Sequence, residues 1–397
     1  MGRDKNLKRR LLKVILIIVL ASLFLEGAAR IFHTSDLSGA LFDFHPVFGH
    51  LSVTGHYASR IERSEPYFPV DINREGFRDD DHAKSKSQNT FRIAVLGDSF
   101  VEAIQVPREQ SSTFLLQQEL ARLHSSQMEL LNFGTNGFGT LQEYLVLKNM
   151  ALSYNPDLVV LVFCVNNDVS DNAAGVFPHR LPSPEPYAEM IGEKLVIHPP
   201  TDRRTTLEKI VLFCWERFHF YSHFYRSWKL LLANLRFHLH PLLHAHRYDN
   251  PFSEEFVFSD PYSSEWSQAW DITKRLILDM KSLCDEHGVK FALVVTDAGE
   301  IQVNPNLHLE RVRQQVLFKK VTGKNLDFNK PERILEKFSE EHDVPFLVLS
   351  RELERYSQRT GQRVHFSKDQ HWNSAGHQAV AEAVQTFLDT AKLLPDR

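Results

Sequence analysis

Cysteine is scarce in this sequence, which has only three in 397 residues: Cys164, Cys214 and Cys284. They are too few and too widely scattered for a disulfide framework or a cysteine metal cluster. Cys164 ends an apolar run, where a small buried side chain is expected. The cysteines therefore say little about the compartment in which the protein works.

A basic excess is also missing, since the net charge is -4. Positive charge is concentrated in the first 13 residues, where Asp4 is outnumbered by Arg3, Lys5, Lys8, Arg9, Arg10 and Lys13. The rest of the chain is thus more acidic than the total indicates, which argues against nucleic acid as a partner. With 43% hydrophobic and 24% charged residues, the chain is predicted to be globular.

No apolar run near the N-terminus is as long as a standard membrane span. After the basic cluster, residues 14–25 are apolar except for Ser22, and the predicted helix continues to Phe32. So short a run suits a signal peptide, and residues 27–29, Gly-Ala-Ala, resemble a cleavage site. Lys13 can instead lengthen the span by snorkelling, and the basic flank would keep the N-terminus cytoplasmic. We favour an uncleaved single-pass anchor; cleavage would leave a secreted or periplasmic protein, with the body outside the cytoplasm either way.

Five apolar runs, separated mostly by helical patterns, predict an α/β fold. The runs are 93–96, 128–133, 158–164, 289–295 and 344–349, and helices are predicted at 112–123, 141–152, 266–287, 330–341 and 374–388. Uninterrupted apolar strands are typical of a parallel sheet covered on both faces, and right-handed crossovers leave few topologies. We predict a doubly wound, five-stranded parallel sheet in the flavodoxin-like order 2-1-3-4-5, which binds ligands at its switch point.

The chain divides into three predicted regions. Residues 1–32 form the membrane anchor or signal segment, 33–90 a polar linker and lead-in, and 91–391 the α/β domain. A mostly helical insertion at about 170–262 interrupts this domain and is crowded with aromatic and basic residues between about 207 and 239. It could be a substrate-shaping cap or an amphipathic helix on the membrane, but an aromatic face packed on the main domain is favoured.

Polar motifs follow three of the predicted strands, and a fourth precedes the last helix. They are Gly97-Asp98-Ser99, the glycine loop 134–139, the asparagine turn 166–168, and the loop that carries Asp369 and His371. Each is also typical of an ordinary turn. Because the carboxyl ends of parallel strands meet at one sheet edge, the first three motifs are predicted to converge.

In their chain order, the four blocks resemble those of the SGNH superfamily of serine esterases and acyltransferases, also called the GDSL hydrolases. The resemblance covers about residues 70–391, apart from the insertion. It implies Ser99 as nucleophile, His371 as general base and Asp369 as the residue that orients the base. It also implies an oxyanion hole formed by Ser99, Gly137 and Asn167, with no cofactor.

Two features depart from the family pattern. Val165 stands where the family often has glycine, and one residue rather than the commoner two separates Asp369 from His371. The resulting Asp-x-His-Trp form is similar to that of the alginate-acetylation branch of the superfamily. This departure shifts the expected substrate class more than the expected activity.

Other histidines have structural interpretations. His377, at the start of the last helix, is expected to pack or hydrogen-bond locally, which leaves His365 as the only rival base. Two further pairs are spaced four apart, His219 with His223 and His240 with His244. Spacing suggests no third ligand for either pair, so we predict no metal site.

The expected function is a serine esterase that cleaves acyl esters, chiefly O-acetyl esters, through a covalent acyl-enzyme. Its expected partners are an acylated small molecule or glycan, and the membrane through the N-terminal segment. Transfer of an acetyl group to an exported polysaccharide is the alternative on the same fold. A non-catalytic glycan-binding protein is the alternative of a different class.

Overall fold

The computed structural model describes residues 42–59, 68–124, 127–173, 176, 184–192, 194–202, 204–206, 209, 254–367 and 369–395, with isolated positions between 13 and 24. The chain separates into two compact units, Ser38–Asp202 with Tyr248–Arg397, and Met1–Leu37 with Arg203–Arg247. The predicted N-terminal segment and the predicted helix at 207–239 lie almost entirely outside the described residues. No helix in the described part of the chain has the length and hydropathy needed to cross a membrane.

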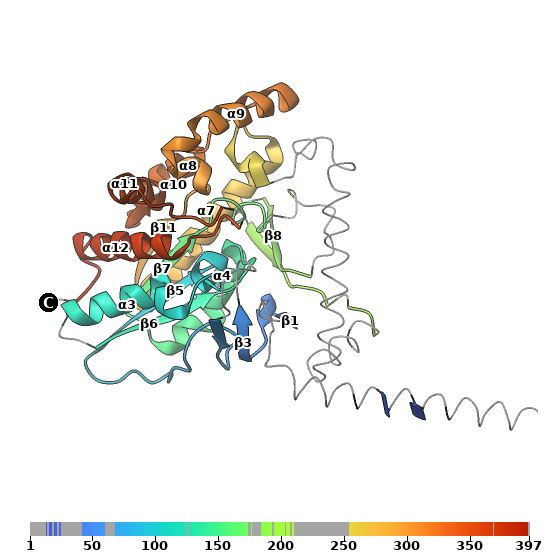
Figure 1. The fold of residues 1–397 in the computed structure, drawn as a ribbon, viewed down its shortest axis with the longest axis vertical. Helices are drawn as coiled ribbons and strands as arrows, with labels where there is room; N and C mark the ends of the chain where they lie inside the picture. The colour runs from blue at the N-terminus through green and yellow to red at the C-terminus, as the bar shows by residue number, and fades with distance from the viewer. Residues whose placement is uncertain are drawn as a thin grey trace, which may run out of the picture. The chain divides into compact units, whose positions relative to one another are not determined.

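A five-stranded parallel sheet lies at the centre of the larger unit (Figure 1). Its strands, in spatial order, are β6 (Gln127–Gly134), β5 (Thr90–Gly97), β7 (Leu158–Phe163), β11 (Lys290–Val295) and β13 (Phe346–Val348). In chain order this is 2-1-3-4-5, and every neighbouring pair is parallel, so the predicted fold class and strand order are confirmed. All six residues of β7 are buried, as expected of a strand covered on both faces.

Helices cover both faces of the sheet. They are α2 (Ser99–Glu102), α3 (Ser112–Leu123), α4 (Thr140–Asn149), α7 (Ser264–Glu286), α8 (Glu300–Val303), α9 (His308–Thr322), α10 (Lys330–Glu341), α11 (Leu349–Thr360) and α12 (Ser374–Thr390). Ile93 and Val95 of β5 pack in one core cluster with residues of α3 and α12. Ala94 and Leu96 pack in a second cluster with α4 and α7. This alternation along one strand is what a doubly covered sheet requires.

Short antiparallel pairs surround the sheet. They are β1 (Phe42–His45) with β2 (Gly49–Ser52), β3 (Gly55–Ser59) with β4 (Phe68–Ile72), β8 (Tyr187–Ile191) with β9 (Lys194–His198), and β10 (Ser259–Asp260) with β12 (Asn325–Leu326). Single turns of 3₁₀ helix are η1 (Arg108–Gln110), η2 (Ala151–Tyr154), η4 (Glu254–Phe258) and η5 (Pro305–Leu307). The first two hairpins thus lie in the region predicted as linker and lead-in.

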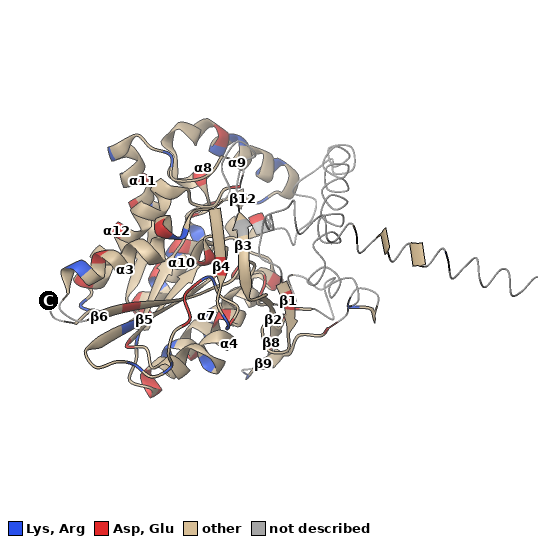
Figure 2. Cartoon of the chain, turned by 60° about the horizontal axis from the view of Figure 1, so that its bottom comes forward, with Lys and Arg blue, Asp and Glu red and all other residues tan. Residues whose placement is uncertain are grey.

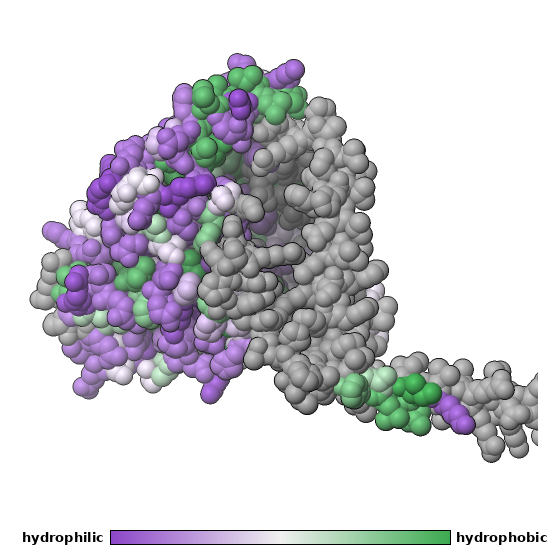
Figure 3. Space-filling model, in the orientation of Figure 1, coloured by the Kyte–Doolittle hydropathy of each residue, from purple (hydrophilic) through white to green (hydrophobic). Residues whose placement is uncertain are grey.

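Charged and apolar surface residues are distributed differently. Lys, Arg, Asp and Glu lie mainly on the helices and loops around the sheet (Figure 2). Most of the coloured surface in Figure 3 is hydrophilic, but hydrophobic residues gather over α9, where Leu309, Val316 and Leu317 are exposed. The apolar residues of this helix are therefore not all directed at the core.

Candidate active site

The candidate nucleophile, Ser99, is the first residue of α2, directly beyond the end of β5. Asp98 caps this short helix, its Oδ1 accepting the Phe100 N–H at 2.9 Å. A backbone N–H in the first helical turn has no acceptor within its own helix, so that of Ser99 is placed to serve a bound group. The Ser99 side chain is nearly buried, at 8% exposure for the residue. A rigid turn thus presents one hydroxyl at the edge of the sheet.

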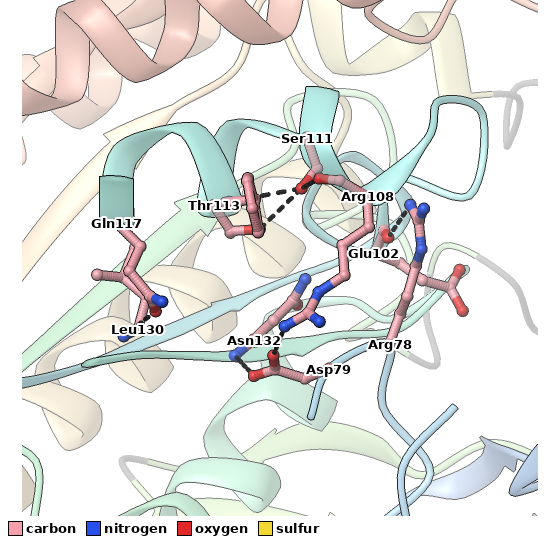
Figure 4. Close-up of a pocket in the computed structure, with 10 residues that line it drawn as sticks. Arg78, Asp79, Glu102, Arg108, Ser111, Thr113, Gln117, Leu130 and Asn132 are labelled. Atoms are coloured by element: carbon pink, nitrogen blue, oxygen red, sulfur yellow. Dashed lines mark hydrogen bonds and ion pairs between the residues drawn. The ribbon is translucent and has the colours of Figure 1, made fainter. Parts of the chain in front are cut away.

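Arg78 and Asp79 lie beside Glu102, the last residue of α2, and Asn132 of β6 (Figure 4). The buried Arg78 guanidinium donates to three backbone carbonyls at the end of α2 and just beyond it, those of Glu102, Ala103 and Val106. Burial lowers the pKa of Arg78 to about 10, and nearby Glu102 opposes that fall. Oδ2 of Asp79 accepts the backbone N–H of Asn132 in β6 at 2.9 Å. Nδ2 of Asn132 donates to the carbonyl of Val101 in α2 at 2.9 Å, so α2 is joined both to the lead-in segment and to β6.

Ser99, His371 and Asp369 lie close together in space, although Ser99 is near the start of the domain's sequence and the other two are near its end. Nε2 of His371 is 2.7 Å from Oγ of Ser99, and its Nδ1 contacts Oδ1 of Asp369. A carboxylate only accepts hydrogen bonds, so Nδ1 carries the proton and Nε2 is left to accept from the serine hydroxyl. This is the order of nucleophile, base and orienting acid that nucleophilic catalysis needs.

The electrostatics of this group favour a base that titrates above the ordinary range. Burial opposes charging of His371, but its hydrogen bond with Asp369, the Asp369 charge and the nearby Asp98 charge outweigh burial and raise the pKa. Burial raises the pKa of Asp369, yet the same contact with His371 outweighs it, and the net shift is downward. Asp369 is therefore ionised while His371 exchanges a proton.

A buried pair supports the loop that carries His371. Oδ1 of Asp297, just beyond β11, is 2.9 Å from Nε2 of His365, and both side chains are fully buried. Oδ2 of Asp297 accepts the indole N–H of Trp372 at 3.1 Å. The Phe100 ring packs against His371 and Trp372, with centroids 4.8 and 4.7 Å apart. His365, the rival base, is therefore held by Asp297 and not by the nucleophile.

His377 lies in the core on the α12 side of the sheet. Its Nδ1 accepts the backbone N–H of Ser112, at the start of α3, at 3.2 Å. Burial lowers its pKa to about 3, so the ring is neutral. The predicted structural role is confirmed, although its hydrogen-bond partner is far away in sequence rather than local.

The glycine loop and the asparagine turn meet at the same sheet edge. Nδ2 of Asn167 donates to the carbonyl of Phe138 at 2.9 Å, which orients the amide and leaves its second N–H for another acceptor. Gly137 is exposed and has φ +78, a conformation that favours glycine. In the sheet register, Gly97 pairs with Gly134 of β6 and with Val162 of β7. The turns holding Ser99, Gly137 and Asn167 therefore follow three adjacent strands.

A buried acidic cluster lies beside the nucleophile turn and was not foreseen from the sequence. Burial raises the pKa of Asp98. Burial, together with repulsion from neighbouring carboxyl groups of the cluster, raises the pKa of Glu143 and of Asp168 strongly. Oδ2 of Asp168 accepts the Cys164 N–H at 2.9 Å, whereas neither Glu143 oxygen has a hydrogen-bond partner among the described residues. Glu143 and Asp168 therefore stay protonated and neutral at pH values well above the range in which carboxyl groups usually ionise.

Other residues near the site were also missed. Asp297 follows the end of a predicted strand, as Ser99 and Asn167 do, and this position could have marked it as a candidate site residue.

Within the described ranges, no group of three or more His, Cys, Asp or Glu side chains is arranged to hold a metal ion. Cys164 and Cys284 are free and buried. Cys214 and the four histidines of the two spaced pairs lie outside those ranges.

No protein-family model and no curated protein matches the sequence. Among solved structures, similarity is found to an acetyl xylan esterase, with 14% identity over 75% of this chain and 98% of that chain and a TM-score of 0.39. A two-domain esterase active on acetylated mannans has 13% identity, 77% and 51% coverage and a TM-score of 0.38. The lipase/acylhydrolase from Enterococcus faecalis has 12% identity, 77% and 99% coverage and a TM-score of 0.35.

Proposed function

We propose that the protein is a serine esterase of SGNH type that cleaves acyl esters through a covalent acyl-enzyme. The observation that carries the proposal is the 2.7 Å contact between Ser99 Oγ and His371 Nε2, with Asp369 on the other imidazole nitrogen. A non-catalytic glycan-binding protein has no need of a histidine within hydrogen-bond reach of the serine. The geometry thus favours the enzyme over that alternative.

The chemistry follows from the positions of the groups. As Ser99 Oγ attacks the acyl carbonyl, His371 Nε2 takes its proton, and Asp369 stabilises the imidazolium. The backbone N–H groups of Ser99 and Gly137 and the Asn167 amide donate hydrogen bonds to the oxyanion. Each donor lowers the activation free energy by about 3 kcal/mol. His371 then protonates the departing alcohol. Water, deprotonated by the same base, releases the acid and restores Ser99.

The proposed substrate is an O-acetyl ester of a glycan. The support is the Asp369-x-His371-Trp372 form, which resembles that of the alginate-acetylation branch. The same resemblance favours a second candidate, an O-acetyltransferase that passes the acetyl group from Ser99 to a hydroxyl of an exported polysaccharide. We also propose that the N-terminal segment anchors the protein in the membrane, with the catalytic domain on the extracytoplasmic side.

Serine-directed labelling tests the esterase proposal. Full-length protein is treated with a fluorophosphonate, digested and mapped, and its hydrolysis of an aryl acetate and of an acetylated glycan is measured. The label should map to Ser99, and Ser99→Ala should lower kcat by about 10⁴-fold or more. Ser267→Ala, at an exposed serine of α7, should retain wild-type activity. Full activity in Ser99→Ala, or a label on another serine, would contradict the proposal.

Acceptor dependence separates hydrolysis from transfer. The acetyl donor is turned over with and without a deacetylated polysaccharide, and both free acetate and acetylated polysaccharide are quantified. A hydrolase releases acetate at a rate that the acceptor does not change. A transferase turns over faster with the acceptor and places the acetyl group on it.

A further inference from the structure

A histidine of the first hairpin reaches the glycine loop. His50 lies on β2, in the region predicted as linker, and its Nε2 is 2.8 Å from the carbonyl oxygen of Asn136. Its Nδ1 is 3.0 Å from Oε1 of Glu185, which belongs to the region predicted as insertion. Two segments that had no role in the proposed chemistry thus meet at the loop that carries Gly137.

The peptide unit that His50 contacts is the one that contains the Gly137 N–H. In a trans peptide, the Asn136 carbonyl and the Gly137 N–H share one plane and point in opposite directions. A hydrogen bond to the carbonyl therefore fixes the direction of the N–H. It also polarises the amide, because hydrogen bonds in a chain strengthen one another.

The contacts of His50 define its charge. The Asn136 carbonyl can only accept a hydrogen bond, and so can the carboxylate of Glu185, whose side chain is 36% exposed. Both ring nitrogens must then donate, and the ring is an imidazolium. Burial opposes this charge, but the hydrogen bond and charge of Glu185, the hydrogen bond to Asn136 and the charge of Glu102 together outweigh burial, and the pKa of His50 is raised.

The surroundings hold both the ring and the loop. The His50 ring packs edge-on against Phe42 and Phe138, with centroids 5.0 and 5.1 Å away. Oε2 of the buried Glu102 accepts the Asn136 N–H at 3.1 Å, so the peptide units on both sides of Asn136 are held. The direction of the Gly137 N–H is therefore set by contacts rather than by the glycine loop alone.

We propose that His50, paired with Glu185, is a positioning residue that orients and polarises the Asn136–Gly137 peptide as an oxyanion donor. The proposal rests on the esterase function above, because the donor has a task only when an acyl carbonyl is attacked. It predicts a loss in kcat rather than in KM, since the oxyanion forms in the transition state and not in the bound substrate.

The test compares His50→Phe, His50→Gln and Glu185→Gln with His56→Phe in the full-length protein, using aryl acetate kinetics. His50→Phe keeps a ring but removes both donors, and should lower kcat about 10- to 100-fold with little change in KM. His50→Gln restores a neutral donor to the carbonyl and should recover part of this loss. His56, whose side chain is 92% exposed on β3, provides the matched control and should give wild-type kcat.

Glu185→Gln keeps the test decisive where His50→Phe does not fold. It retains an acceptor for Nδ1 but removes the charge that stabilises the imidazolium, and should lower kcat about threefold to tenfold with a native melting temperature. Wild-type kcat in folded His50→Phe, or in Glu185→Gln, overturns the inference, as does an equal loss in His50→Phe and His50→Gln. Ser99→Ala is run alongside: if it stays active, the esterase proposal itself fails, whatever the His50 variants do.

Discussion

The indole Nε1 of Trp372 donates a hydrogen bond to Oδ2 of Asp297 at 3.1 Å, joining the His371 loop to the residue just beyond β11. The other carboxylate oxygen of Asp297 lies 2.9 Å from His365, and His365 forms an antiparallel bridge with Trp372. The base is thus positioned by its own neighbours in sequence, which are fixed to the sheet at a fully buried carboxylate.

Trp372→Phe should weaken this attachment. It leaves Oδ2 of Asp297 short of a donor in a buried place, which costs about 1–3 kcal/mol of unfolding free energy. Looser placement of His371 should also lower kcat roughly tenfold. Urea unfolding and aryl acetate kinetics measure the two effects. Trp270→Phe, in the α7 layer on the other face of the sheet, should lose stability but keep kcat; equal kcat in both variants would argue against the attachment.

Asp369→Asn should change both the height and the position of the pH–rate profile. The Asp369 carboxylate raises the pKa of His371, and the reaction needs neutral His371, so activity rises with pH through that pKa. Without the charge, the acid limb should move to lower pH, while the plateau kcat falls about 10²- to 10⁴-fold. The profile is recorded from pH 5 to 9. An acid limb that stays in place would show that His371 is not the titrating base.

Asn167→Ala should remove one oxyanion donor. We expect kcat to fall about 10²- to 10³-fold with KM nearly unchanged, because the donor acts on charge that develops in the transition state. Asn149→Ala, at an exposed position near the end of α4, is the control and should behave as wild type. A fall confined to KM would instead assign Asn167 to substrate binding.

Glu143→Gln should stabilise the protein at alkaline pH. Burial raises the pKa of Glu143 in the folded state, so the folded protein binds its proton more tightly than the unfolded chain does. Stability from this group is present below the unfolded pKa, near 4.5, and is lost as pH rises toward the folded value. Glutamine does not titrate, so the gain in unfolding free energy should be larger at pH 8 than at pH 5. Glu382→Gln, at the surface of α12, should show no such difference.

The sheet was predictable because its signals are local, whereas the pairing of Ser99 with Asp369 and His371 was expected only from the resemblance to the SGNH superfamily. Buried strands such as β7 are continuous apolar runs, and each polar motif stands directly after a strand or before the last helix. α3 and α10 have the predicted bounds for a similar reason, since their apolar residues repeat on one buried face.

The sequence did not predict helices and contacts that have no matching pattern of apolar or turn residues nearby. In α9, Leu309 and Val316 are exposed, so apolar spacing does not mark a core face. α11 begins at Leu349, immediately after β13, with no turn residue to separate strand from helix. His50 lies 86 residues from Asn136, and nothing near it in sequence indicates that contact.

The tie between Arg78 and the end of α2 has a practical consequence for producing the protein. A recombinant fragment trimmed to begin at Thr90, where the sheet starts, would retain Ser99, Asp369 and His371. It would leave the carbonyls of Ala103 and Val106 without their buried guanidinium donor. Such trimming should yield a less soluble fragment with a misplaced serine. Expression boundaries should therefore be set upstream of Phe42.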